Sequence, residues 1–124
     1  MYEIKKTFEI NAAHFLTLDY PSKCAELHGH NWRVTVYLRS AELNANGMVM
    51  DFTEIKQRIT AKLDHKVLND VVDFNPTAEN LARYICGELA PFCYRTDVRE
   101  SEGNTATYWK PDEDIPRCTC GYNL

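Results

Sequence analysis

The segment 28–39 constrains the fold more than any other part of this chain. Its apolar residues alternate with polar ones at the period of a β-strand, and they share one side of that strand with two histidines. The residues on this side are His28, His30, Trp32, Val34, Val36 and Leu38. Such a strand has one face in the core, and the two histidines lie together at the beginning of that face.

The N-terminal segment shows the same alternation over residues 2–10, with its apolar side chains on one face. If this parity continues to residue 14, His14 points to that same face. The loop 15–27 is a short connection between the two strands, which favours antiparallel pairing. His14 is therefore expected beside His28 and His30.

The rest of the chain predicts two helices followed by two short strands. Asp51, with Glu54 as its capping partner, marks the start of a helix over 52–63. Its apolar stripe consists of Phe52, Ile55, Ile59 and Leu63. The segment 64–74 is read as a connection.

The second helix opens at Asn75-Pro76-Thr77, where Asn75 or Thr77 can cap it, and ends at Pro91. Its apolar face consists of Ala78, Leu81, Ala82, Ile85 and Leu89. Strands are expected over 94–100 and 105–109. The predicted fold class is α+β: a four-stranded antiparallel sheet with both helices on one face, in the order ββααββ.

The composition of the 124 residues, 44% hydrophobic and 26% charged, is typical of a globular protein. The formal charge of −4 and the pI near 5.5 provide no basic surface for nucleic acid. The N-terminus lacks the apolar stretch of a signal peptide, and no segment approaches about 18 apolar residues. We therefore expect a cytoplasmic protein that binds neither nucleic acid nor a membrane.

The three histidines are the candidate metal ligands. A single inward histidine is more often a hydrogen-bonded core residue, but three imidazoles at one end of a strand pair are costly to bury without a partner. Zn²⁺ takes such a nitrogen set, with three protein ligands leaving a fourth position open. Cupin-like sites also use an H-x-H pair, but they need a carboxylate later on the same strand, where this chain has Val34, Thr35 and Val36.

Three further residue groups are candidates for proton transfer or binding. Cys24 lies four residues before His28, so a nearby cation would favour its thiolate; it is a base or nucleophile, a fourth zinc ligand, or an inert thiol. Asp64-His65 has the composition of an acid/base dyad. The strand parity turns Glu100 inward, although the residue pattern alone favours a solvated acid at the end of a strand.

The other cysteines carry no clear chemistry. Five cysteines at uneven spacing do not form the framework of a secreted disulfide protein. Cys86 and Cys93 are expected to be structural. Cys118 and Cys120 either chelate a second metal or form an incidental pair in a C-terminal tail.

Together these residues resemble the family of 6-pyruvoyltetrahydropterin and 6-carboxytetrahydropterin synthases, the latter including the bacterial QueD enzymes of queuosine and deazapurine pathways. The resemblance covers residues 1–109, which would form a single catalytic domain, and leaves 110–124 as a tail of unknown role. The motifs that carry it are Ala12-Ala13-His14, Cys24-x3-His28-Gly29-His30-Asn31, Gly47-Met48-Val49-Met50-Asp51-Phe52, Leu63-Asp64-His65, Asn75-Pro76-Thr77-Ala78-Glu79-Asn80, and Glu100 eight residues before Tyr108.

The resemblance implies a tunnelling fold (T-fold) that assembles into a homo-oligomer, usually a hexamer. It also implies a lyase acting on 7,8-dihydroneopterin triphosphate, with roles for seven residues. In these roles zinc is held by His14, His28 and His30, Cys24 is the general base, Asp64 and His65 transfer protons across a subunit interface, and Glu100 anchors the pterin.

The spacing between the cysteine and the HGH motif helps to separate the activities within the family. Carboxy synthases typically have three intervening residues and animal pyruvoyl synthases five, and this chain has three, Ala25-Glu26-Leu27. A folate-pathway branch carries Glu where this chain has Ala25. The resemblance therefore favours 6-carboxytetrahydropterin as the product. The alternatives are pyruvoyl synthase activity and a zinc- or pterin-binding module without turnover.

Overall fold

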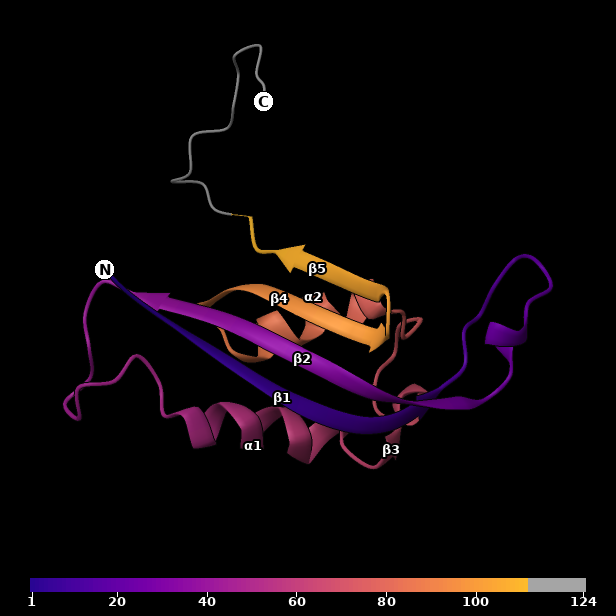
Figure 1. Ribbon diagram of the computed structural model, residues 1–124, viewed down its shortest axis with the longest axis horizontal. Coiled ribbons are helices and arrows are strands. Elements are labelled where there is room, and N and C mark those ends of the chain that lie inside the picture. The colour runs from indigo at the N-terminus through magenta and orange to yellow at the C-terminus, as the bar shows by residue number, and fades with distance from the viewer. Residues whose placement is uncertain (112–124) are drawn as a thin grey trace, which may run out of the picture.

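The computed structural model describes residues 1–111 and shows a curved sheet with two helices on one side (Figure 1). The sheet has five strands in the order β3-β1-β2-β4-β5. Along the chain the elements are β1 (Tyr2–His14), η1 (Lys23–Ala25), β2 (His28–Ser40), α1 (Phe52–Leu63), β3 (Lys66–Val67), η2 (Leu68–Asp70), α2 (Ala78–Glu88), β4 (Cys93–Ser101) and β5 (Asn104–Trp109).

The antiparallel pair of β1 and β2 is the centre of the sheet, as the alternation predicted. Its register runs without interruption from Tyr2 opposite Ser40 to His14 opposite His28. The alternation of apolar and polar residues fixes this register, because a slip by one residue would turn every core side chain to solvent. The pairing brings the end of β1 next to the start of β2, where the predicted histidines are.

The prediction of a four-stranded, purely antiparallel sheet is wrong. The segment Lys66–Val67, read from the sequence as part of a connection, pairs in parallel with Ala12 and Ala13 and adds β3 at the edge of β1. Two residues are too few to show an alternating pattern, so this strand has no signal in the sequence. The sheet is therefore mixed.

Helix α1 begins after Asp51, whose side chain accepts a hydrogen bond from the Thr53 amide at 2.8 Å. The expected capping partner, Glu54, instead pairs with Arg58 one turn later. Phe52, the first helical residue, was also predicted in the apolar stripe, but it is 48% exposed. The buried stripe consists of Ile55, Ile59 and Leu63.

Helix α2 begins after Thr77, the residue that caps it, because its hydroxyl accepts a hydrogen bond from the Asn80 amide at 3.1 Å. Asn75, the other candidate cap, has a different partner that is described below. The buried face of the α2 region consists of Leu81, Ala82, Ile85, Cys86 and Leu89. Burial of Cys86 and Cys93 agrees with their expected structural role.

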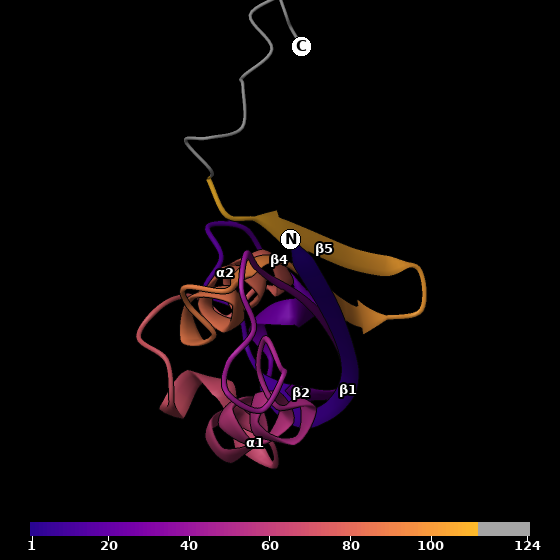
Figure 2. The same ribbon diagram turned by 90° about the vertical axis from the view of Figure 1, so that its left-hand side faces the viewer.

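Both helices pack on the same face of the sheet, which curves around them (Figure 2). The core between them includes Trp32, Val36 and Leu38 of β2, each at most 2% exposed. Among residues 1–111, no helix is long and apolar enough to span a membrane. Cys118 and Cys120 lie outside the described residues.

Candidate metal centre and active site

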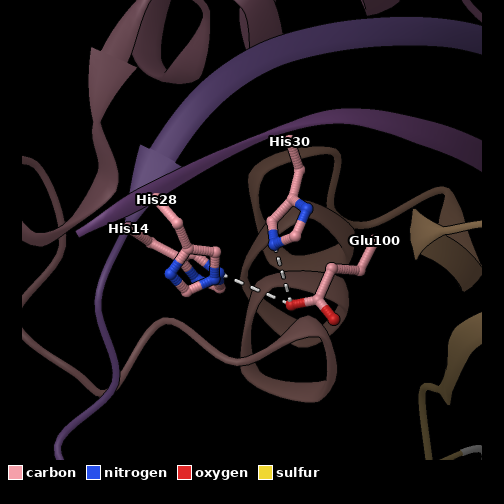
Figure 3. A group of neighbouring side chains, drawn as sticks. All are labelled: His14, His28, His30 and Glu100. Carbon is pink, nitrogen blue, oxygen red and sulfur yellow. Dashed lines mark ion pairs between the residues drawn. The ribbon is translucent and has the colours of Figure 1, made fainter. Parts of the chain in front are cut away.

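Three histidines and one glutamate meet at one end of the helix-facing side of the sheet (Figure 3). His14 is the last residue of β1, His28 and His30 open β2, and Glu100 lies near the end of β4. One ligand atom from each residue lies within 4.8 Å of the others. The pairing of His14 with His28 and of Ala12 with His30 places the three imidazoles together, as the sequence predicted.

Hydrogen bonds to backbone carbonyl groups fix the orientation of two of these rings. Nδ1 of His14 lies 2.7 Å from the carbonyl oxygen of Pro76, and Nδ1 of His28 lies 2.7 Å from that of Glu26. A carbonyl oxygen only accepts, so in both rings Nδ1 carries the proton. In a neutral imidazole this leaves the Nε2 lone pair free, which is the arrangement that protein metal sites use.

Two Nε2 atoms of the histidine group lack a hydrogen-bond partner. Nε2 of His14 and Nε2 of His30 are buried and make no hydrogen bond. A buried polar atom without a partner carries a desolvation cost of about 1–3 kcal/mol, and such atoms are rare in folded proteins. A bound cation would provide the partner that both atoms lack.

Glu100 completes the group. Its Oε1 lies 3.5 Å from Nε2 of His14 and 3.5 Å from Nε2 of His30. Two ligands at tetrahedral positions, each about 2.0–2.1 Å from a zinc ion, lie about 3.4 Å from each other. The spacing and the donor set of three nitrogens and one oxygen therefore fit a small divalent metal. Glu100, which the sequence predicted only as a substrate contact, lies close enough to bind such a metal.

Burial favours the neutral, metal-binding form of two of these imidazoles, His14 and His30. Removal from water lowers the pKa of His14, and the hydrogen bond to Pro76 only partly opposes this effect. Burial also lowers the pKa of His30, partly opposed by the charge of Glu100. A neutral ring at physiological pH has its lone pair available, so metal binding does not require removal of a bound proton.

Trp32 supports the cluster from the core. Its ring contacts those of His14 and His30 edge to face, with centroids 4.8 Å and 5.1 Å away. Its indole N–H donates to the carbonyl oxygen of Ala12 at 3.1 Å. From the sequence, Trp32 was expected only as a core residue, although its parity with His30 along β2 places it on the same face as the histidines.

Cys24 lies on the short turn η1, in the loop between β1 and β2, and is exposed. The turn is capped by Ser22, whose hydroxyl accepts a hydrogen bond from the Cys24 amide at 3.1 Å. The carbonyl group of Cys24 accepts from the Leu16 amide at 2.8 Å, which ties the turn to the segment just after His14. Cys24 is not among the residues whose ligand atoms form the metal cluster.

Asp64 and His65 follow α1 and are bound to β1 through its residue Asn11. The Asn11 amide donates to the Asp64 carboxylate at 2.8 Å, and the His65 amide donates to the Asn11 carbonyl group at 2.7 Å. His65 has φ 58°, a left-handed conformation that is uncommon for residues other than glycine and that clusters at functional sites. Its Nε2 lies 3.5 Å from the Asp64 carboxylate.

This dyad does not join the metal cluster within the chain. His65 lines an open cavity of about 530 Å³ together with Asn11, Asn31, Lys66 and the candidate ligand His30. Asn11 and Asn31 alternate with the residues that face the core, so their side chains point to the opposite face of the sheet from the metal ligands. The His65 side chain is 77% exposed, which leaves it accessible to a group from outside the chain.

Residues 3–111 match the family model described as 6-pyruvoyl tetrahydropterin synthase. A 6-carboxy-5,6,7,8-tetrahydropterin synthase of Synechocystis is 36% identical over 124 residues, covering 90% of this chain and 95% of the relative. A 6-pyruvoyl tetrahydrobiopterin synthase of Dictyostelium discoideum is 37% identical over 98 residues, covering 69% and 73%.

The fold leads to the same family. The structure of Caenorhabditis elegans 6-pyruvoyl tetrahydropterin synthase superposes with a TM-score of 0.71 at 26% identity, over 89% of this chain and 96% of that one. The mixed sheet with two helices is thus the T-fold architecture of that enzyme, and the matched segment includes all four residues of the metal cluster. On this evidence the chain belongs to the 6-pyruvoyl tetrahydropterin synthase family.

Proposed function

We propose that this chain is a zinc-dependent 6-carboxy-5,6,7,8-tetrahydropterin synthase of queuosine and deazapurine biosynthesis. It converts 7,8-dihydroneopterin triphosphate and one water to 6-carboxytetrahydropterin, acetaldehyde and triphosphate. The pterin ring gains the two electrons that the side chain loses, so no external redox cofactor is needed. The observation that carries the proposal is the pair of buried, unpartnered Nε2 atoms of His14 and His30, which face the Glu100 carboxylate.

The three histidines hold the metal, and the backbone carbonyl groups of Pro76 and Glu26 fix the rings of two of them. A bound zinc ion would supply Lewis acidity toward the hydroxyl groups of the substrate side chain. Cys24 removes a proton from a carbon of that side chain. Its exposed position on η1 leaves the sulfur free to meet a substrate.

Asp64 and His65 form the proton-transfer dyad, with the carboxylate orienting the imidazole. Because Asp64 and His65 are not among the residues whose ligand atoms converge on the metal site of this chain, the dyad serves the site of a second copy across a subunit interface. The family resemblance favours a homohexamer for this assembly. The open cavity beside His65 is consistent with such an arrangement, since it leaves room for a group from another subunit.

Glu100 anchors the pterin. A carboxylate can accept two parallel hydrogen bonds from the 2-amino group and the adjacent ring N–H of a pterin, and such charge-assisted pairs are among the stronger hydrogen bonds. The position of Glu100 beside His14 and His30 would bring the pterin ring close to the metal. Without substrate, the same carboxylate can interact with the metal directly.

The choice of product rests on the loop that carries Cys24. Three residues separate Cys24 from His28, the spacing of the carboxy synthases, and Ala25 provides no carboxylate for the folate-type reaction. The Synechocystis relative, which covers nine tenths of this chain, carries the carboxy synthase name. The Dictyostelium relative makes pyruvoyl synthase activity the second candidate.

Mass spectrometry of the pterin formed from dihydroneopterin triphosphate tests the proposal. We expect 6-carboxytetrahydropterin, with acetaldehyde released in equal amount. Formation of 6-pyruvoyltetrahydropterin would favour the second candidate, and 6-hydroxymethyldihydropterin would favour the folate branch. Unchanged substrate that stays bound to the zinc-loaded protein would mean that the chain is a binding module without turnover.

A further inference from the structure

Two asparagine side chains hold the segment that leads from β1 into the loop carrying Cys24. The Asn69 amide oxygen accepts a hydrogen bond from the Phe15 N–H at 2.9 Å, and its NH₂ group donates to the Phe15 carbonyl group at 2.9 Å. The Asn75 side chain does the same to Thr17, at 2.9 Å and 3.1 Å. Each side-chain amide thus pairs with the backbone of one residue as a neighbouring strand would, because it accepts from that residue's N–H and donates to its carbonyl group.

The residue between the two clamped positions is bonded to Cys24. In an extended segment the backbone groups of successive residues point to opposite sides, so Leu16 faces away from the two asparagines. Its amide donates to the carbonyl oxygen of Cys24 at 2.8 Å. The position of the Cys24 backbone therefore depends on a segment that Asn69 and Asn75 hold from the other side.

Asn75 is itself held by the start of α2. Its carbonyl group accepts hydrogen bonds from the Thr77 amide at 2.8 Å and from the Asn80 side chain at 2.9 Å. The next residue, Pro76, accepts the 2.7 Å hydrogen bond from His14 that orients this metal ligand. Asn75 thus holds the segment that positions Cys24, and the next residue, Pro76, orients the ring of His14.

We infer that Asn69 and Asn75 are positioning residues that keep Cys24 at a fixed place relative to the metal ligands. This inference rests on the proposed function in that it takes Cys24 as the general base. A loop without these clamps still folds and still carries the thiol, but the thiol then samples many positions. Misplacement of a reacting group by about 1 Å can cost about 100-fold in rate.

Three variants test this role. Asn75→Ala removes both hydrogen bonds to Thr17, whereas Asn75→Asp keeps the acceptor for the Thr17 amide but places a carboxylate oxygen, in place of the donor, against the Thr17 carbonyl group. Asn44→Ala is the control, because the Asn44 side chain also makes two backbone hydrogen bonds, both as acceptor, from the amides of Asn46 at 2.9 Å and Met48 at 3.1 Å. Asn44 lies in the turn that follows Ser40, the last residue of β2, whereas His28 is the first residue of that strand.

Amide hydrogen exchange is the first measurement, and it does not depend on activity. In Asn75→Ala we expect exchange of the peptide 15–27 to rise by about tenfold, with little change in the peptide 28–40. Asn75→Asp should also give a rise, because two oxygen atoms then face each other at Thr17, and Asn44→Ala should give none in 15–27. Unchanged exchange in Asn75→Ala would overturn the inference, because the amide would then not hold the loop.

Kinetics on the zinc-loaded protein is the second measurement. We expect kcat of Asn75→Ala to fall by about 10- to 100-fold, KM to change by less than about threefold, and zinc content to stay at the wild-type value. Faster exchange with unchanged kcat would overturn the positioning role. Loss of zinc would overturn it as well, because the effect would then act through His14.

Alkylation of Cys24 separates this inference from the proposed function. A nearby zinc ion changes the reactivity of a thiol that is held close to it, so the iodoacetamide rate at Cys24, followed by peptide mapping, should differ between zinc-loaded and metal-free wild type. In Asn75→Ala this difference should shrink toward zero. If the wild type forms no product from dihydroneopterin triphosphate, the proposed function fails. If zinc changes the iodoacetamide rate at Cys24 equally in wild type and in Asn75→Ala, the positioning role is overturned, whatever the outcome for the proposed function.

Discussion

His14 donates a 2.7 Å hydrogen bond to the carbonyl oxygen of Pro76, although the two residues are 62 positions apart in the chain. The strand pair β1 and β2 brings the histidines together, but this bond comes from the segment before α2. It selects the tautomer of His14 and aims Nε2 at the other ligands. The candidate metal centre is thus built jointly by the sheet and the segment before α2.

Removal of a single histidine should empty the metal site. In His28→Ala and in His30→Ala we expect bound zinc to fall from about one per chain to about a tenth or less, because two imidazoles and one carboxylate hold the ion far more weakly. Elemental analysis after purification in zinc-containing buffer measures this. His65→Ala is the matched control and should keep its zinc, since His65 lies outside the cluster. Full occupancy in both alanine variants would refute the three-histidine site.

The alternation of β1 and β2, together with the short loop 15–27 between them, was sufficient to predict the central strand pair and the meeting of His14 with His28 and His30. A slip by one residue would turn the apolar side chains to solvent, so the alternation places the three histidines on the buried face of the sheet, and the loop places them at the same end. Helix α1 was predicted at its observed bounds for a similar reason, since Asp51 marks its start and the buried stripe gives its length.

The contacts that orient the site were not predictable in this way. The carbonyl group of Pro76 and the side chains of Asn69 and Asn75 form hydrogen bonds with residues distant in the chain. No repeating pattern in the sequence signals single contacts of this kind. Asn75 illustrates the limit: a local reading made it a candidate helix cap, whereas its side chain holds Thr17. The two-residue strand β3 was missed because its length carries no pattern.

Replacement of the proposed base should abolish turnover without disturbing the metal. We expect Cys24→Ala to keep its zinc and its thermal unfolding temperature, because the side chain is exposed and lies outside the cluster. Its kcat should fall by about 100-fold or more, the usual contribution of a positioned base. Cys86→Ala is not a suitable control, because that thiol is buried. A zinc loss in Cys24→Ala would make the thiol a ligand, and undiminished turnover would remove it from the mechanism.

The metal-free protein should lose stability as the pH falls below about 6.5. Burial lowers the pKa of His14 and of His30 in the folded state, so the unfolded chain binds more protons than the folded one in this range. The two neutral rings therefore contribute fully to the free energy of unfolding above the unfolded-state pKa of 6.5. This contribution is lost as the pH falls toward their lower pKa values in the folded state.

Urea unfolding of the chelator-treated protein at several pH values measures this effect. The free energy of unfolding should be lower at about pH 5.5 than at about pH 7.5, and His14→Asn should show a shallower decrease. A free energy of unfolding that rises as the pH falls through this range would contradict the assignment of both rings as neutral in the folded state.

Glu100→Gln distinguishes an anchor for the pterin from a ligand for the metal. An amide can accept only one of the two parallel hydrogen bonds and carries no charge, so loss of one charge-assisted bond should weaken pterin binding by about 1.5–3 kcal/mol. This corresponds to a dissociation constant about 10- to 150-fold higher, measurable by titration of the zinc-loaded protein with a dihydropterin. Glu102→Gln, on the exposed turn between β4 and β5, is the matched control and should bind as the wild type does.

If Glu100→Gln keeps its zinc and loses pterin affinity, the carboxylate acts on the substrate. If it loses zinc instead, the 3.5 Å approach of Glu100 to His14 and His30 reflects a fourth metal ligand, and the pterin must be anchored by another residue.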